Sequence, residues 1–416
     1  MAYPVAGARA MQGLWRACAA AHPAWDGTYH RRMAGPHGAS GFPRGGRGVL
    51  PGQLIEHAIT AGYVDAGRFK VPPENVQPAS LDLRLGETAY RIRCSFLPGR
   101  EPVEAKLEEY TLDEIDLRRG AMLEVGHPYL VELKERLHLP EGLRGKANPK
   151  SSTGRVDVFT RVVTDRSARF DEIANGYDGA LYLEVVPLSF AIRVREDLTL
   201  NQLRLAIGKP TLTDTEIREA HARRPLLYRA DRPVPSDELV LSDGLFLGLD
   251  LRGDERGRVG YSAREHAPLL DLGRTGEIDP EPFWDPVVRE RGNRLVLSPN
   301  KFYLLMSDDA VSVPPDLAAE MTAYDPTSGE LRTHYAGFFD PGFGFDPAGG
   351  FRGSRAALEV RAHDVPFMIE HGQTVCKLTF ERMLEPPDVL YGPTIGSSYQ
   401  RQAETLSRHF QRDRSA

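Results

Sequence analysis

The sequence predicts a mainly β protein made of two tandem, related domains with a few short helices. Glycine and proline, 40 and 32 of the 416 residues, exceed their usual share of about 12% and separate short apolar runs. Within those runs polar and apolar residues alternate at period two, which is typical of half-buried strands. Several runs recur 174 or 175 positions later, which indicates an internal duplication.

The composition argues against several classes of protein. A net charge of -6 does not predict the broad basic surface of a nucleic-acid binder. No uncharged apolar run approaches the roughly 18 residues of a membrane helix. Cys18, Cys94 and Cys376 are too scattered for a disulfide framework or a metal clamp. We therefore expect a cytoplasmic protein without nucleic-acid or membrane partners.

The first part of the chain divides into an extension and a domain. Residues 1–47 contain six arginines and one acid with little apolar periodicity, which predicts a poorly ordered extension. Leu54, Ile55 and Ala58 then fall at helical spacing and predict a short helix. This helix opens a first domain over 48–210. Its alternating strands are expected at 81–85, 90–93, 129–133, 180–185 and 190–194.

A linker helix separates this domain from a second one. Thr213 is followed three residues later by Glu216, a capping-box pattern that predicts a helix within a linker over 211–240. The second domain covers 241–386, and 387–416 forms a C-terminal arm. Strands of the second domain are expected at 245–251, 294–297, 302–306, 357–360, 365–369 and 375–380.

The recurring runs share one register. Residues 129–131 (Tyr-Leu-Val) recur as 303–305 (Tyr-Leu-Leu), 174 positions later. Residues 183–185 (Leu-Glu-Val) recur as 358–360 (Leu-Glu-Val), 175 positions later. Repeated matches at nearly one offset indicate a tandem duplication.

Each repeat places a glutamate, Glu184 or Glu359, in the middle of an apolar strand. Burial disfavours a charged carboxylate and raises its pKa, so either residue is a candidate general base near neutral pH. The alternative is a structural glutamate paired with an arginine such as Arg361.

Four segments resemble motifs of the dCTP deaminase and dUTPase family. They are the opening strand 77–86, the phosphate loop 150–155, the base-recognition hairpin 335–343 and the covering arm 391–402. The family fold is a distorted, jelly-roll-like β-barrel, so the resemblance implies two tandem dUTPase-like barrels.

The resemblance also implies roles for individual residues. The phosphate loop contributes Lys150, Ser151, Ser152 and Arg155, with Ser151 and Arg155 among the catalytic groups. The other implied substrate contacts are Ala336 and Asp340 of the hairpin and Tyr391, Tyr399 and Gln402 of the arm. Two positions depart from the pattern. Lys150 stands where the family has arginine, and Ser398 where many members have lysine, a charge that Arg401 could supply.

In the family, deaminases carry the strand glutamate and dUTPases an apolar residue. The resemblance therefore implies hydrolytic deamination of dCTP to dUTP and ammonia. The chain lacks the His-x-Glu and Pro-Cys-x-x-Cys motifs of zinc deaminases, so we expect no zinc and no protein metal site, only Mg²⁺ bound through the triphosphate. Two alternatives stay open: a bifunctional enzyme that continues to dUMP, and a non-catalytic deoxynucleotide-binding regulator.

The motifs are unequally divided between the halves. Projecting the phosphate loop by 174 positions reaches Asp325, Pro326 and Gly329, which cannot replace its serines and arginine. Family members are trimers of one barrel with each site between neighbours. We therefore expect a homo-oligomer, a trimer or dimer, and a composite site in which the first-half loop faces Glu359. Glu184 is the rival base if first-half barrels trimerise among themselves.

Overall fold

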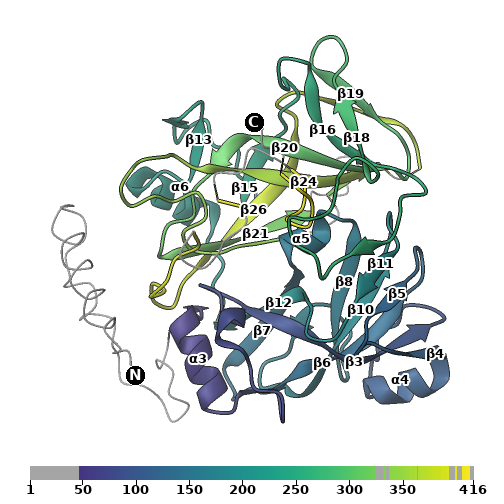
Figure 1. Ribbon diagram of the computed structural model, residues 1–416. Coiled ribbons are helices and arrows are strands. Elements are labelled where there is room, and N and C mark those ends of the chain that lie inside the picture. The colour runs from purple at the N-terminus through teal and green to yellow at the C-terminus, as the bar shows by residue number, and fades with distance from the viewer. Residues whose placement is uncertain are drawn as a thin grey trace, which may run out of the picture. The chain divides into compact units, whose positions relative to one another are not determined.

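The computed structural model describes residues 46–323, 331–333, 337–362, 364–392, 399–400 and 405–412. The predicted N-terminal extension lies outside this set, apart from its last two residues. From Arg47 onward the chain forms one compact unit. Most described elements are strands, which confirms the predicted mainly β fold (Figure 1). Among the described residues, no helix is long and apolar enough to cross a membrane.

The first half, residues 47–210, is organised around one barrel-like sheet. Its path runs β8-β10-β6-β3-β12-β7-β9. Strand β3 pairs with β12 near its start and with β6 further along, so it joins two sides of the barrel. The strands are β1 (Gly48–Val49), β2 (Val64–Asp65), β3 (Leu81–Ile92), β4 (Thr111–Asp116), β5 (Ala121–Leu123), β6 (Tyr129–His138), β7 (Leu143–Pro149), β8 (Val158–Thr164), β9 (Glu172–Ile173), β10 (Asp178–Pro187), β11 (Ile192–Val194) and β12 (Thr199–Ile207).

Helices are short. The sequence predicted α3 (Gly52–Thr60) and α6 (Asp214–Arg223), and both are present. In α6 the capping box is complete, because the Glu216 N–H donates to Thr213 Oγ1 over 3.3 Å while the Thr213 N–H donates back to Glu216 Oε2 over 2.9 Å. Periodicity did not indicate α4 (Val103–Tyr110), η1 (Pro73–Asn75) or the single turn α5 (Ser151–Gly154).

The second half, residues 211–412, contains two larger sheets. One runs β14-β13-β20-β16-β18 with β24 beside β20, and the other runs β15-β26-β21-β23. The strands are β13 (Leu227–Arg229), β14 (Arg232–Pro233), β15 (Leu245–Gly248), β16 (Arg258–Ala263), β17 (Leu270–Asp271), β18 (Trp284–Val288), β19 (Arg294–Leu297), β20 (Phe302–Val311), β21 (Leu317–Ala323), β22 (Leu331–Thr333), β23 (Phe338–Phe339), β24 (Ser354–Ala362), β25 (Phe367–Glu370) and β26 (Thr374–Arg382).

Strand register reproduces the duplication seen in the sequence. On β10, Glu184 pairs with Leu130 of β6, and on β24, Glu359 pairs with Leu304 of β20. A second strand pairing also repeats. In the first half β7 pairs with β12, and in the second half β21 pairs with β26. The two glutamates therefore occupy the same place in two copies of one sheet.

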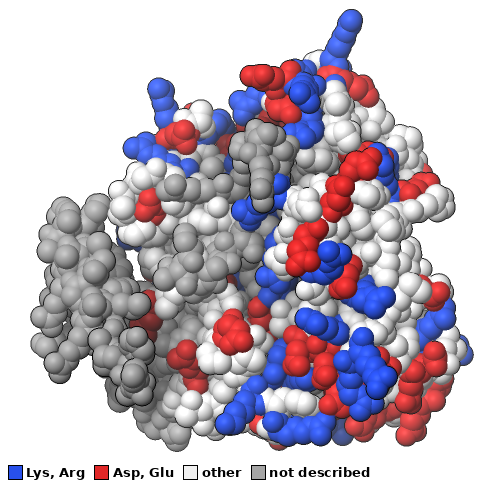
Figure 2. Space-filling model, in the orientation of Figure 1, with Lys and Arg blue, Asp and Glu red and all other residues white. Residues whose placement is uncertain are grey.

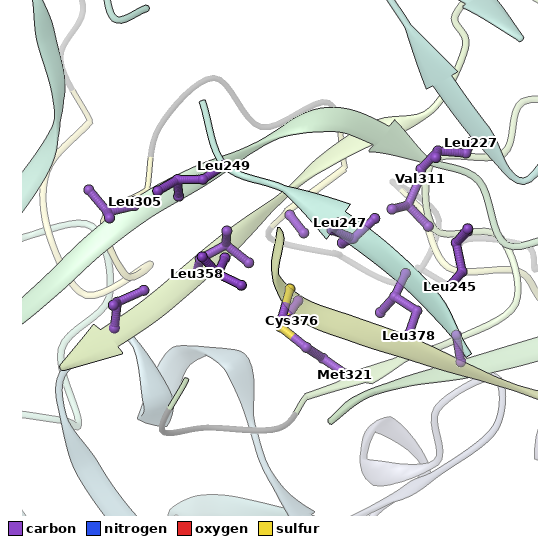
Figure 3. Close-up of a cluster of buried hydrophobic side chains, with 14 of the residues drawn as sticks. Leu227, Leu245, Leu247, Leu249, Leu305, Val311, Met321, Leu358, Cys376 and Leu378 are labelled. Carbon is purple, nitrogen blue, oxygen red and sulfur yellow. The ribbon is translucent and has the colours of Figure 1, made fainter. Parts of the chain in front are cut away.

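Figure 3 shows part of the core of the second half. Leu245 and Leu247 alternate along β15 and pack with Leu358 of β24 and with Cys376 and Leu378 of β26. All five side chains are buried. Successive strand residues point to opposite faces, so this core accounts for the period-two pattern of the sequence.

Ion pairs with at least one buried partner join the halves. Arg204 of β12 is 2% exposed and donates to Glu381 of β26 over 2.8 Å. Lys146 of β7 contacts the buried Glu320 of β21, and Arg361 of β24 contacts the fully buried Asp157. In contrast, acidic and basic side chains are interspersed over the face of the molecule shown in Figure 2.

Candidate functional site

A cavity of about 340 Å³ lies between the halves. Its first-half lining includes the predicted phosphate loop, and its second-half lining includes the hairpin and strand β24. The residues that line it are Glu74, Asn75, Gln77, Asp82, Pro149, Lys150, Ser151, Ser152, Arg155, Thr199 and Gln202 from the first half, with Met321, Gly337, Phe338, Phe339, Asp340, Phe343, Ala357, Glu359, Tyr391, Tyr399 and Arg408 from the second.

The phosphate loop forms a polar wall of this cavity. It follows β7 and turns through α5, which places the two serines side by side: Ser152 is buried and Ser151 half-buried. The Lys150 ammonium contacts the Asp82 carboxylate and donates to Thr199 Oγ1 over 3.0 Å. Asp82 therefore offsets the charge of this lysine.

Arg155 closes the loop and meets the C-terminal arm. Its side chain is buried, and its guanidinium lies 3.8 Å from the centre of the Tyr399 ring, a cation–π contact. It also donates to the Thr405 carbonyl over 3.2 Å. The arm thus fixes the direction of this arginine.

Glu359 faces the loop from β24 and is 6% exposed. Burial raises the pKa of its carboxyl to about 8, against the lowering effect of the Arg155 guanidinium. Arg361, considered as its alternative partner, contacts Asp157 instead. A carboxyl with a pKa near neutrality can accept a proton from water and return it.

Asp340 begins the turn of the predicted hairpin, and the protein uses both of its carboxylate oxygens. Oδ1 accepts from Arg204 over 3.0 Å and Oδ2 accepts from Ser80 over 3.3 Å. Burial raises the pKa of this carboxyl, and Arg204 opposes that effect. Asp340 therefore anchors the hairpin to the first half.

The turn after Asp340 requires glycine. Gly342 has a φ of 104°, and a Cβ on it would lie 2.7 Å from the Tyr391 nitrogen. That close approach lets the Tyr391 N–H donate to the Pro341 carbonyl over 2.8 Å. The hairpin and the start of the arm are joined at this point.

Aromatic rings form the second-half wall. Phe339 and Phe343 meet edge to face with 4.8 Å between centroids, and Phe343 lies 5.8 Å from the Tyr391 ring. Such a wall suits a flat ring or the apolar face of a sugar.

The described part of the arm covers the cavity. The Tyr399 N–H donates to the Tyr391 hydroxyl over 3.3 Å, and Ser407 Oγ donates to the Ser152 carbonyl over 2.9 Å. Gln400 bonds to the hairpin backbone at Gly342. The predicted contacts Ala336 and Gln402, with Ser398 and Arg401, lie outside the described residues.

Glu184 does not line the cavity. It is 1% exposed, and Arg161 donates to its Oε1 through Nε over 3.2 Å. The same guanidinium lies over the rings of Phe159 and Phe170. Pairing with an arginine was the alternative to a general base for both strand glutamates. In the first half Glu184 has such an ion pair.

Several lining residues were not predicted as site residues. Asp82, which contacts Lys150, lies in the opening-strand motif 77–86, and this motif is the sequence signal that could have indicated it. Gln202 and Thr199 lie on β12, a strand that the sequence analysis did not predict. Arg408 lies beyond every recognised motif, and no pattern indicated it.

The donor atoms of the cavity bear on metal binding. Its described lining contains the oxygen donors Glu74 and Asp82 but no histidine or cysteine, a set that fits magnesium better than zinc. Among the described residues, Asp250, Asp308 and His371 bring ligand atoms within 4.8 Å of one another elsewhere. Arginines pair with both of those aspartates, so cations already balance that group.

Two family models match the chain. The model of the 2'-deoxycytidine 5'-triphosphate deaminase N-terminal domain matches residues 46–209, and that of the C-terminal domain matches residues 213–410. A crystal structure of 2'-deoxycytidine 5'-triphosphate deaminase from Agrobacterium tumefaciens is 45% identical, with a TM-score of 0.78. That match covers 84% of this chain and 99% of the other.

Shorter relatives match part of the chain. A protein of Methanobrevibacter smithii named "dCTP deaminase, dUMP-forming" is 31% identical over 126 residues, which are 29% of this chain and 60% of the relative. A protein of Natronomonas pharaonis named "dCTP deaminase" is 29% identical over 154 residues, 36% of this chain and 74% of the relative.

Proposed function

This chain belongs to the two-domain dCTP deaminase family of hydrolases, and we propose that it removes the amino group of dCTP with water to give dUTP and ammonia. One observation carries the proposal: a buried glutamate, Glu359, shares a cavity with a serine- and cation-containing loop. The glutamate supplies a base, the loop suits phosphates, and the aromatic wall suits the nucleoside.

In the proposed reaction, ionised Glu359 takes a proton from the water that attacks C4 of cytosine. The C4–O bond forms, and the tetrahedral centre then collapses as Glu359 returns the proton to the amino nitrogen. The C4–N bond breaks and ammonia leaves. Of the two water protons, one ends on ammonia and the other on ring N3, so the product is a uracil ring.

The remaining cavity residues divide between chemistry and binding. Arg155 lies close enough to Glu359 to oppose the rise in its pKa. We assign Arg155 and Ser151 to stabilising the charge that develops during attack on C4, and Lys150 and Ser152 to holding phosphates. Asp340 keeps the hairpin in place, and Tyr391 and Tyr399 cover the nucleotide.

Magnesium enters this proposal with the substrate. Phosphate oxygens are the hard ligands that this ion prefers, and Glu74 and Asp82 add carboxylate oxygens to the cavity lining. We assign no step of the reaction to it.

We also propose that the protein is a homo-oligomer, a trimer or dimer, because it resembles trimeric one-barrel proteins. Light scattering, which measures the mass in solution, tests this.

The second candidate function is a bifunctional enzyme that continues to dUMP, because some relatives are named "dUMP-forming". The test incubates the protein with dCTP, CTP and dUTP and resolves the products by chromatography. The proposal expects equal amounts of dUTP and ammonia from dCTP, without pyrophosphate. Formation of dUMP and pyrophosphate would support the bifunctional enzyme. Tight dCTP binding with no ammonia over hours would support a regulator instead.

A further inference from the structure

Arg408 lines the cavity from the last described segment of the arm. Its Nε is buried, and within the described part of the chain this atom has no hydrogen-bond partner. A buried donor without an acceptor costs free energy comparable to a lost hydrogen bond. An arginine in this state at a cavity wall has a donor available for a hydrogen bond to a bound anion.

The backbone around Arg408 is held in place. Its N–H donates to the Tyr399 hydroxyl over 3.2 Å, and its carbonyl accepts from the Gly276 N–H over 2.8 Å. Two residues later, Phe410 is 1% exposed and packs against Phe283 and Trp284. These contacts keep the arginine at the cavity.

Arg408 lies at the phosphate-loop end of the cavity. The neighbouring Ser407 Oγ donates to the Ser152 carbonyl. His409 is buried, and its pKa falls to about 4, mainly through burial and further through the charges of Arg408 and Lys150. Both cations therefore lie within electrostatic reach of one imidazole, which is largely uncharged at neutral pH.

The loop end needs this additional charge. A nucleoside triphosphate carries several negative charges, whereas the Lys150 ammonium is offset by Asp82. Arg155 is directed by the Tyr399 ring and the Thr405 carbonyl and lies near Glu359. A planar guanidinium such as that of Arg408, whose Nε is buried, is suited to bidentate binding of phosphate.

We propose that Arg408 binds the terminal phosphates of the nucleotide and makes the site selective for triphosphates over monophosphates. This inference rests on the proposed function and adds a residue to it. The arginine supplies a positive charge that the uncharged Ser398, which stands where many family members have lysine, cannot supply.

The test compares ammonia release from dCTP, dCDP and dCMP by the full-length enzyme and its Arg408→Gln variant. We expect the KM for dCTP to rise about 10- to 100-fold, as for loss of one charge-assisted contact, with kcat within about twofold. The kinetics with dCMP should change less than about twofold. Arg274→Gln, an exposed arginine paired with Glu277 outside the cavity, is the charge-matched control and should behave as wild type.

An unchanged KM for dCTP in Arg408→Gln would overturn the proposal, as would an equal loss with dCMP, since that indicates a structural role. If this variant does not fold, Arg408→Lys replaces it; a severalfold rise in KM is expected and wild-type kinetics would count against the inference. If the wild type releases no ammonia, the proposed function fails separately. Calorimetric binding of dCTP then tests Arg408, with weaker binding by the variant expected and equal binding overturning the role.

Discussion

Glu184 and Glu359 occupy the same register in the two halves, yet their surroundings differ. Glu184 is paired with Arg161, whose guanidinium is held over two phenylalanine rings. Glu359 lines a cavity, and burial raises its pKa to about 8. A shared strand position therefore does not give a carboxylate its function; the nearest cation and the access to a ligand do.

Asp165 and Asp340 are 175 positions apart, at the offset of the repeat, and their surroundings differ in the same way. Asp165 accepts the Val103 N–H at the start of α4 over 2.7 Å, within its own half. Val103 and Leu107 of that helix pack with Tyr182 beside Glu184. Asp340 instead accepts from Arg204 of the other half. The aspartate of the first half therefore binds a helix of its own half, and that of the second half joins the two halves beside the cavity.

The strongest way to break this comparison is to replace each glutamate. Glu359→Gln should lower kcat for dCTP deamination about 10²- to 10⁴-fold, since a general base contributes about that much. Glu184→Gln should keep kcat within a fewfold but lower the free energy of unfolding by about 1–3 kcal/mol, because Arg161 loses its charged partner. Full turnover in Glu359→Gln with loss in Glu184→Gln would reverse the assignment and refute the composite site.

The aspartates offer a second, smaller contrast. Asp340→Asn should reduce kcat/KM about 10-fold or more, because the hairpin loses its charge-assisted contact with Arg204. Asp165→Asn should leave kcat/KM unchanged and cost about 0.5–1 kcal/mol, as loss of a charge at a helix N-terminus does. Kinetics and urea unfolding of both variants test this pair; equal kinetic losses would contradict the division between halves.

The pH dependence sharpens the role of Glu359. The base must be ionised, and its pKa is about 8, so kcat/KM should rise roughly tenfold per pH unit below that value and level off above it. Ammonia release measured from pH 6 to 9.5 checks this. A rate that is flat across pH 7 to 9 would assign the proton transfer to another group.

The smallest expected effect is on stability. Because the folded-state pKa of Glu359 is raised above its unfolded value, the resulting stabilisation is full below the unfolded pKa and is lost as pH rises through about 8. Glu359→Gln should therefore melt roughly 2–4 °C higher than wild type at pH 9, with a smaller difference at pH 5. Melting curves at both pH values test it, and a lower Tm for the variant at pH 9 would contradict it.

Local patterns account for what the sequence predicted correctly. Alternation located part of the strands but missed β7, β8, β12 and β21. The offset located the duplication, and the Thr213 and Glu216 spacing located α6, since each depends on neighbouring residues. The loss of the loop from one copy also predicted that the first-half loop faces Glu359, and both line one cavity. These features need no knowledge of tertiary contacts.

Long-range contacts account for what could not be predicted. Arg361 lies two positions from Glu359 on one strand, yet its partner Asp157 is 204 residues away. The two donors to Asp340 come from β12 and from the residue before β3, in the other half. Arg408 follows no periodicity, and its place depends on how the arm packs against residues 276–278.

Placing the phosphate loop and Glu359 on one polypeptide has a consequence for how the enzyme responds to dilution. Where two walls of a site belong to separate molecules, their encounter depends on protein concentration. Here the chain itself sets a high effective concentration of one wall at the other, and the Arg204 and Arg361 ion pairs hold them in register. The contact between these two walls is therefore independent of the enzyme concentration.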